Sequence, residues 1–212
     1  MPRDGRVNRE RILDAAERLV IDGGYAGTSV DEVIAAAGTS KGAFFHHFGS
    51  KLDLAGALVE RYAAADISHL HRALQVTADV TDPTARLDAF LSFFENGADD
   101  LMGEQSSCLY VAVLTERQLV QSTTTAPVLT AIEAWRAGIA DLLAAVVGQR
   151  ETRQLEALAD HVFVTFEGAF ILCRATGDPS HMRSQLAALR TLLMAWVNSL
   201  DDGRATTRAS DR

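Results

Sequence analysis

Apolar residues recur at spacings of three and four along most of the chain, which is the period of an amphipathic helix. Five such stripes stand out: Ile12–Val20, Leu87–Leu101, Val128–Val146, Leu155–Cys173 and Leu186–Leu200. Short apolar runs that would also suit a strand have no pairing partners, because no Asn-Gly or Asp-Gly turn joins two alternating runs. The pattern therefore predicts an all-α fold.

Prolines mark where several of these helices begin. Pro83, Pro127 and Pro179 each precede an apolar stripe, and none falls inside one. Asp82 and Asp178 stand before two of them, so a capping carboxylate adjoins a proline at the first helical position, where no N–H is needed. We expect new helices to start at these three prolines.

Charge is unevenly distributed along the 212 residues, whose net charge is −8. Residues 1–51 carry seven basic and seven acidic side chains, so the remaining 161 residues account for the whole excess of acid. DNA attraction depends on the field at the contacting face, so an acidic total does not exclude a nucleic-acid partner for residues 1–51. The four arginines among residues 1–11 fit either an arm that enters the minor groove or a solvated terminus.

Membrane, export and metal-binding signals are missing from the sequence. The longest apolar run, Cys108–Leu114, has seven residues, far short of the roughly 20 that a membrane helix needs. No basic-then-apolar leader opens the chain. Cys108 and Cys173 match no metal-ligand spacing and fit either buried thiols or oxidant sensors. We expect a cytoplasmic protein without a metal or cofactor.

Residues 28–54 carry the most informative pattern. Thr28 and Ser29 stand three residues before Asp31 and Glu32, the spacing of a capping box, which predicts a helix start. Gly38 ends that helix after two turns. A second short helix follows, capped by Thr39 or Ser40 and stopped after Phe48 by Gly49-Ser50. Two short helices joined by a glycine turn, after a longer first helix, are the outline of a helix-turn-helix.

Helices this short are not stable alone, because isolated helices need about 12 residues or more. They must pack on the first helix through apolar side chains, namely Val30, Ile34, Phe44 and Phe48. The outward positions of the second short helix are then Lys41, Gly42, Ala43 and His46. Small residues at 42 and 43 would let this helix sit deep in a major groove, while Lys41 reaches a guanine edge. His47 and Lys51 are placed for phosphates.

In this stretch the sequence closely resembles the TetR family of transcriptional regulators. The shared residues are Thr28, Ile34-Ala35, Ala37-Gly38, Ser40, Gly42, an aromatic at Phe45, His47-Phe48, Lys51 and Leu54. The resemblance covers about the first 55 residues. It implies two domains, a DNA-binding domain over residues 1–50 and a helical ligand-binding and dimerisation domain over residues 51–212. Apolar positions from Leu54 to Ala65 predict one continuous helix leading out of the first domain.

Residue roles in DNA binding follow from the same resemblance. It places at or near the bases Ser40, Lys41, Gly42, Ala43 and Phe44. It places along the phosphate backbone Thr28, Phe45, His47 and Lys51. Family members usually have tyrosine where this chain has Phe45, so one phosphate hydrogen bond is lost here.

The second domain is rich in aromatic residues, most of which suit an ordinary core. As lining of a ligand pocket we expect Phe93, Phe94, Tyr110, Trp135, Phe163, Phe166 and Phe170. Three nearby polar residues suit either ligand orientation or ordinary surface and ion-pair roles: Glu116, His161 and Arg174. The last two helices, over about 152–175 and 180–200, carry more apolar residues than one stripe explains. For a dimer interface we expect Phe163, Ala169, Leu189, Leu192 and Trp196, in the four-helix bundle that the resemblance implies.

These features predict a homodimeric, ligand-responsive transcriptional repressor. It would bind a palindromic double-stranded DNA operator and be released by a small apolar or aromatic effector. Two alternatives stay open, a helical binding module with a vestigial DNA-binding domain and an enzyme using Glu116 or His161 as a general base. The sequence contains no phosphate loop, nucleophile elbow or His-Glu-x-x-His motif to support catalysis.

Overall fold

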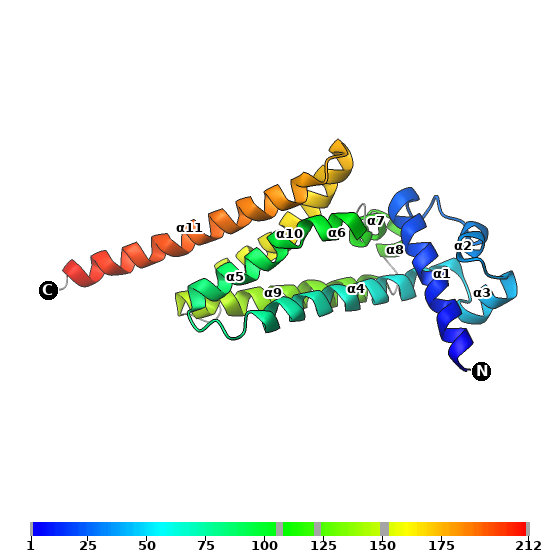
Figure 1. Ribbon diagram of the computed structural model, residues 1–212, viewed down its shortest axis with the longest axis horizontal. Coiled ribbons are helices and arrows are strands. Elements are labelled where there is room, and N and C mark those ends of the chain that lie inside the picture. Colours follow the sequence, from blue (N-terminus) through cyan, green and yellow to red (C-terminus); the bar gives the residue numbers. More distant parts are fainter. Residues whose placement is uncertain (1, 105–107, 121–123, 149–152, 211–212) are drawn as a thin grey trace. The chain divides into compact units, whose positions relative to one another are not determined.

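The computed structural model describes residues 2–104, 108–120, 124–148 and 153–210, and over these residues the chain forms eleven helices and no strand (Figure 1). In order they are α1 (Pro2–Gly23), α2 (Val30–Ala37), α3 (Lys41–His47), α4 (Lys51–Val76), α5 (Pro83–Asn96), α6 (Ala98–Glu104), α7 (Leu109–Leu114), α8 (Arg117–Val120), α9 (Thr125–Val147), α10 (Arg153–Thr176) and α11 (Ser180–Ser210). The all-α prediction is confirmed. Helix α5 begins at Pro83 and α11 directly after Pro179, whereas α9 begins two residues before Pro127. Asp82 caps α5 through a 2.7 Å hydrogen bond from the Ala85 N–H.

Packing divides the chain into two compact units. The head unit comprises residues 1–66 and 105–131, and the body unit comprises residues 67–104 and 132–212. The head unit therefore includes α7 and α8 as well as the three helices of the predicted DNA-binding domain. The predicted division of function between residues 1–50 and 51–212 does not coincide with these packing units, and it stays a prediction.

In the head unit, α1 supplies the central apolar face. Ile12 and Leu13 are completely buried, and α2 and α3 both pack on α1. Phe44 of α3 and Phe48, which follows α3, enter the same core, and Leu109 of α7 is buried as well. The short helices thus obtain from α1 the apolar contact that they cannot supply alone.

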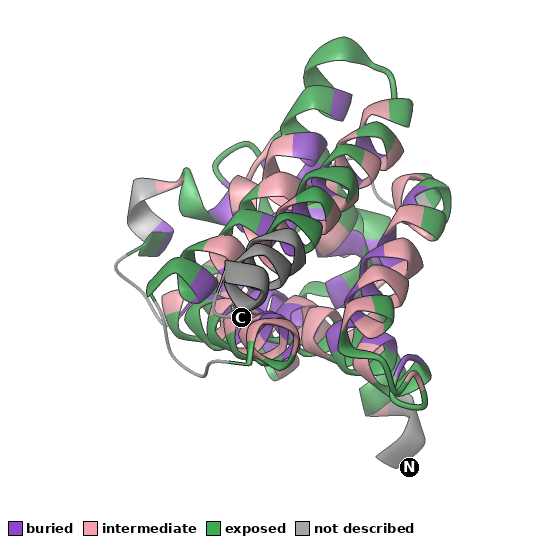
Figure 2. Cartoon of the chain, turned by 90° about the vertical axis from the view of Figure 1, so that its left-hand side faces the viewer, coloured by how far each residue is buried: buried purple, intermediate pink, exposed green. Residues whose placement is uncertain are grey.

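In the body unit, α11 packs against both α5 and α10. Buried positions recur along one side of each long helix (purple in Figure 2), and Phe90, Ile139 and Met182 are completely buried. The guanidinium of Arg190 on α11 forms a bidentate pair with Asp88 of α5 at 2.7 and 2.8 Å. Among the described residues, no helix has the length and apolar character that crossing a membrane requires.

Candidate nucleic-acid interface

The start of α2 is fixed by a reciprocal capping box. The Oγ of Ser29 accepts a hydrogen bond from the Glu32 N–H at 3.1 Å, and the Glu32 carboxylate accepts one from the Ser29 N–H at 2.7 Å. These hydrogen bonds stabilise the ionised carboxylate and lower the pKa of Glu32 below its usual value. The predicted helix start is confirmed at Ser29, so the orientation of α2 is set by its own first turn.

The turn between α2 and α3 is held by Gly38 and by a contact from α1. Gly38 adopts a left-handed conformation with φ of 58°, as the sequence predicted for this turn. The Arg11 guanidinium donates hydrogen bonds to the carbonyl oxygens of Ala37 and Gly38. The Thr39 hydroxyl donates to Asn8 of α1 at 3.0 Å. The sequence placed Arg11 in either a minor-groove arm or a solvated terminus, and this contact with the turn was not predicted.

Ser40 caps α3, and two phenylalanines anchor it from within. The Oγ of Ser40 accepts the Ala43 N–H at 3.1 Å. Phe44 is 0% exposed and lies against Phe48, with ring centroids 5.7 Å apart. The predicted placement of Phe44 at or near the bases is therefore wrong for its side chain, because the ring points into the core. Phe44 supports the outward face of α3 instead of forming part of it.

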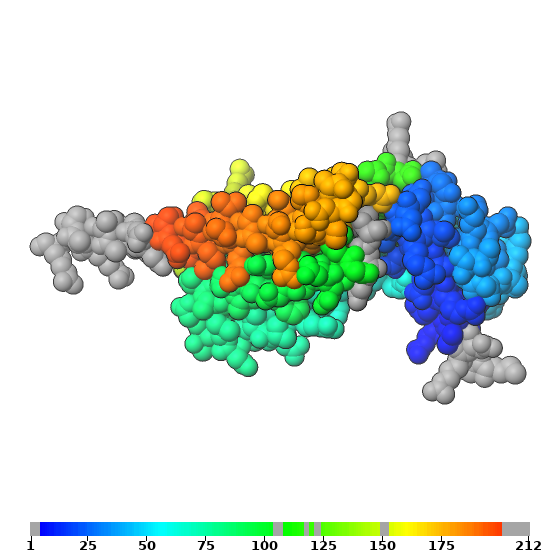
Figure 3. Space-filling model, turned by 45° about the horizontal axis from the view of Figure 1, so that its top comes forward, coloured from blue at the N-terminus to red at the C-terminus, as the bar shows by residue number. Residues whose placement is uncertain are grey.

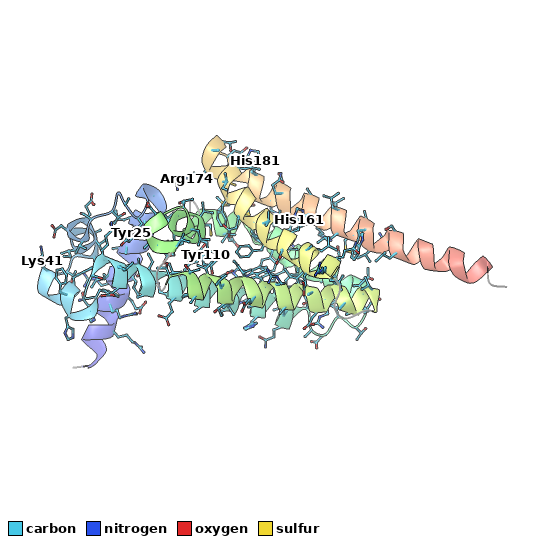
Figure 4. All side chains as sticks on the ribbon, turned by 180° about the vertical axis from the view of Figure 1, so that it is seen from behind. Tyr25, Lys41, Tyr110, His161, Arg174 and His181 are labelled. Atoms are coloured by element: carbon cyan, nitrogen blue, oxygen red, sulfur yellow. The ribbon has the colours of Figure 1, made fainter. Side chains whose placement is uncertain are left out.

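The outward face of α3 carries the other predicted base-contacting residues. Ser40, Lys41 and Gly42 are exposed, Ala43 is partly exposed, and the Lys41 side chain extends away from the helix (Figure 4). A Cβ built on Gly42 meets no atom within 4 Å, so the backbone of α3 is open to close approach at this point. The Lys41 Nζ lies 3.5 Å from an Asp31 carboxylate oxygen on α2.

The predicted phosphate contacts occupy more varied environments. Thr28 is buried, and its hydroxyl donates to the Gly24 carbonyl at 2.9 Å. The Lys51 ammonium donates to the Tyr25 carbonyl and lies 4.1 Å above the Tyr25 ring. Phe45 is 47% exposed. Of this set, Phe45 presents the largest open surface, whereas Thr28 and Lys51 also hold the turn before α2.

His47 lies at the end of α3, beside the start of α1. Its Cε1 is 3.9 Å from a Cβ built on Gly5. Desolvation lowers the pKa of His47 below its usual value, and the nearby charges of His46 and Arg9 lower it further. The imidazole is therefore mainly neutral at pH 7 in the free protein, and it is partly exposed.

Two further connections tie elements together inside the head unit. Arg61 of α4 donates to three carboxylates on successive turns of α1, namely those of Glu10, Asp14 and Glu17. Glu116, between α7 and α8, accepts the Ala26 N–H at 3.2 Å. Burial and the Glu116 charge both raise the pKa of Tyr25. The predicted DNA-binding helices are thus tied to α4 and to the α7–α8 segment.

The predicted ligand-pocket residues fall in both units. In the body unit, Phe94 packs against Phe93 and Trp135, each with centroids 5.1 Å away, and against Phe166 at 5.4 Å. The His69 ring stacks on Phe94, with ring centroids 5.5 Å apart.

Tyr110 belongs to the head unit, where its ring centroid lies 5.0 Å from that of Tyr62 and its hydroxyl donates to Asp66 at 3.0 Å. Phe163 and Phe170 lie on α10, the first partly exposed and the second buried.

The predicted dimer residues divide between core and surface. Ala169 is 1% exposed and Leu189 is 3% exposed, so the chain's own core already covers them and their prediction as interface residues needs correction. Leu192 is 66% exposed, and Phe163 and Trp196 are partly exposed. Figure 3 shows α11 (orange to red) along one face of the body unit. Three more apolar residues on α10 are exposed, namely Val164, Ile171 and Leu172.

Known proteins resemble the chain over both predicted domains. Residues 12–58 match the family described as bacterial regulatory proteins, tetR family. Residues 83–201 match the family described as transcriptional regulator LmrA/YxaF-like, C-terminal domain.

Individual relatives match different lengths of the chain. The HTH-type transcriptional activator FasR of Mycolicibacterium smegmatis is 33% identical over 125 residues, 55% of this chain and 56% of that protein. The HTH-type transcriptional repressor AcnR of Corynebacterium glutamicum is 44% identical over 57 residues, 27% of this chain and 30% of that protein. The crystal structure of a TetR transcriptional regulator from Chloroflexus aurantiacus has a TM-score of 0.71 and 26% identity, covering 89% of this chain and 95% of that one. Identity is thus highest where the match is confined to a short segment.

Proposed function

The chain belongs to the TetR family of DNA-binding transcriptional regulators, and from this premise we propose that it is a homodimeric repressor released from a palindromic operator by a small molecule. The observation that carries the proposal is the outward face of α3. A rigidly capped helix presents Ser40, Lys41 and Gly42 to solvent, while Phe44 and Phe48 hold it from below. This face fits the major groove, which admits an α-helix and displays a distinct pattern for each base pair. A chromosomal operator would place its action in the cytoplasm.

Dimerisation follows from the small number of base pairs that one α3 helix can read. Two heads related by a two-fold axis read a palindrome when their recognition helices lie about 34–36 Å apart, or a multiple of this distance. Exposed apolar side chains on α10 and α11, namely Val164, Ile171 and Leu192, support a four-helix bundle between two copies of the body unit.

Release by an effector requires the effector to bind one conformation of the dimer more tightly than the other. The aromatic cluster around Phe94 favours an apolar or aromatic effector. Within the head unit, Arg61 and Glu116 supply contacts through which a movement of α4 or of the α7–α8 segment reaches α1 and the turn before α2. A coupling of about 1–3 kcal/mol between the two sites is typical of such systems.

The assignment as a repressor is more specific than the family, because the chain resembles both an activator and repressors. FasR is named an activator and AcnR a repressor, and AcnR has the higher identity over its shorter match. A reporter gene driven by the selected operator tests this point directly. We expect reporter output to fall when the protein is produced, and a rise would reverse the assignment.

Selection of binding sites from a pool of randomised duplexes tests the DNA-binding proposal. We expect the full-length protein to enrich a palindrome, and light scattering to give a species of twice 22.9 kDa. Enrichment of no sequence, or a monomer at micromolar concentration, would refute the proposed function.

Gly42→Ala supplies a matched test of close approach by α3. The added methyl group meets nothing within 4 Å in the free protein, so stability should be kept or slightly raised by helix propensity. Operator affinity should fall, because the methyl group enters the space between helix and base edges. Unchanged affinity would show that α3 does not sit deep in the groove.

A further inference from the structure

An ion pair joins the two short helices on their outward side. The Lys41 Nζ at the start of α3 lies 3.5 Å from an Asp31 carboxylate oxygen in the first turn of α2. The side chains are 68% and 80% exposed, respectively. A pair this open to solvent adds little to the stability of the fold. It lies beside Ser40 and Gly42, on the surface that the proposed function assigns to DNA.

The chemistry of this pair suits one kind of base pair. A lysine ammonium only donates hydrogen bonds, and an ionised aspartate only accepts them. In the major groove, a G·C pair presents the guanine N7 and O6 acceptors next to the cytosine N4 donor. An ammonium over the guanine and a carboxylate over the cytosine amino group therefore engage all three groups.

An A·T pair matches the same two side chains less well. Its major-groove edge places the adenine N6 donor between two acceptors, adenine N7 and thymine O4. If the carboxylate accepts from the central adenine amino group, only one acceptor, adenine N7, remains for the ammonium. On the other side, the carboxylate faces thymine O4 without a donor between them. The pair thus discriminates by repulsion as well as by attraction.

We propose that Asp31 and Lys41 act together to read one G·C base pair in each half-site, with Lys41 on guanine and Asp31 on cytosine N4. This inference rests on the proposed function and adds the base identity at one position. The role assigned to Asp31 differs from that of a phosphate contact, because a carboxylate repels phosphates.

Duplexes altered at single atoms test the inference. The selected operator is prepared with 7-deazaguanine, which lacks the N7 acceptor, or with 2-pyrimidinone, which lacks the cytosine amino group, at each G·C position in turn. At one position in each half-site, each replacement should weaken binding of the unaltered protein by about 5- to 150-fold, the range for one base-edge contact. Asp31→Ala should be insensitive to loss of the amino group, and Lys41→Ala to loss of N7.

Controls separate base reading from the general effect of charge. Glu60→Ala removes one exposed carboxylate from α4, so it should leave the response to both replacements unchanged. Melting temperatures of the Asp31 and Lys41 variants should stay close to that of the unaltered protein, because both side chains are exposed. The double variant should lose the response to both replacements, because each of the two residues contacts a different group of the base pair.

The outcomes distinguish this inference from the proposed function. A palindrome whose recognition depends on Lys41 but is indifferent to Asp31 overturns the paired reading and leaves the DNA-binding proposal standing. A uniform rise in affinity for all duplexes in Asp31→Ala, without a change of base preference, also overturns it. Failure to select any palindrome removes the proposed function itself.

Discussion

Helices α3 and α11 obtain their stability in opposite ways. Helix α3 has seven residues and depends on single groups, namely the Ser40 cap, Gly38 before it and the buried Phe44 ring. Helix α11 has 31 residues, packs along α5 and α10, and carries the Arg190–Asp88 pair on its side. A short helix needs defined residues at its ends, whereas a long helix needs an apolar stripe that many sequences supply. This difference explains why the resemblance seen in the sequence rested on residues 28–54, whereas the body showed only its apolar stripes.

Phe44→Ala tests the dependence of α3 on one ring and should have the largest effect. Removing a completely buried phenylalanine costs about 3–5 kcal/mol of unfolding free energy, and operator binding should be lost with the shape of α3. The neighbouring Phe45→Ala is the matched control, since its exposed ring should change stability by less than about 0.5 kcal/mol. Urea unfolding followed by circular dichroism measures both. Equal losses of unfolding free energy in the two variants would contradict the dependence of α3 on Phe44.

A pair of glycine substitutions compares helix ends in the two units. Gly38 and Gly177 both have positive φ, 58° and 71°, so alanine at either position should cost about 1–2 kcal/mol in backbone strain. A Cβ at Gly38 also lies 3.0 Å from the Arg11 Nη2, whereas a Cβ at Gly177 meets no atom within 4 Å. Gly38→Ala should therefore destabilise more and weaken operator binding, while Gly177→Ala should leave binding intact. The reverse order in thermal unfolding would remove the role assigned to Arg11.

The pH dependence of operator binding tests the contribution of His47, at the end of α3. A phosphate beside the imidazole raises its pKa above the lowered value of the free protein, so binding takes up a proton. The resulting affinity is fully present below the free-state pKa and is lost as the pH rises through the bound-state pKa. Between these two values, affinity should fall by at most tenfold per pH unit.

Fluorescence anisotropy from pH 5 to 8 at constant ionic strength measures this slope. His47→Gln should flatten it, whereas His71→Gln, at an exposed position of α4 in the body unit, should not. A slope unaffected by His47→Gln would place the proton elsewhere.

Phe45→Tyr should give the smallest effect. The ring is exposed at the end of α3, so a hydroxyl group adds one phosphate hydrogen bond without changing the core. Operator affinity should rise by about 0.5–1.5 kcal/mol, with unfolding free energy unchanged. Titration of a fluorescent operator at fixed salt measures the gain. If affinity does not rise, the missing hydroxyl has no part in binding.

What the sequence predicted well is local. Capping at Ser29, the left-handed turn at Gly38 and the all-α fold depend on residues within a few positions of one another, which periodicity and turn chemistry describe. For Phe44, the apolar period correctly placed the ring inside, whereas the family resemblance placed it at the bases.

What the sequence missed depends on pairing between distant segments. Arg11 meets carbonyls 26 and 27 residues further along the chain, and Arg61 meets α1 over 44 to 51 residues. No period links such positions. In the body, surplus apolar residues on α10 and α11 predicted an interface, which stays a prediction, but Ala169 and Leu189 serve the packing within the chain. An apolar stripe shows that one face of a helix is buried, but it does not show which neighbouring helix or partner chain covers that face.

The length of α4 has a mechanical consequence. Its 26 residues form one uninterrupted helix about 39 Å long at 1.5 Å per residue. A rod of that length amplifies rotation, because a tilt of about 10° about one end displaces the other by about 7 Å, roughly two steps of the DNA ladder at 3.4 Å each. Under the proposed function, a small change in the angle of α4 would therefore suffice to move α3 out of register with an operator.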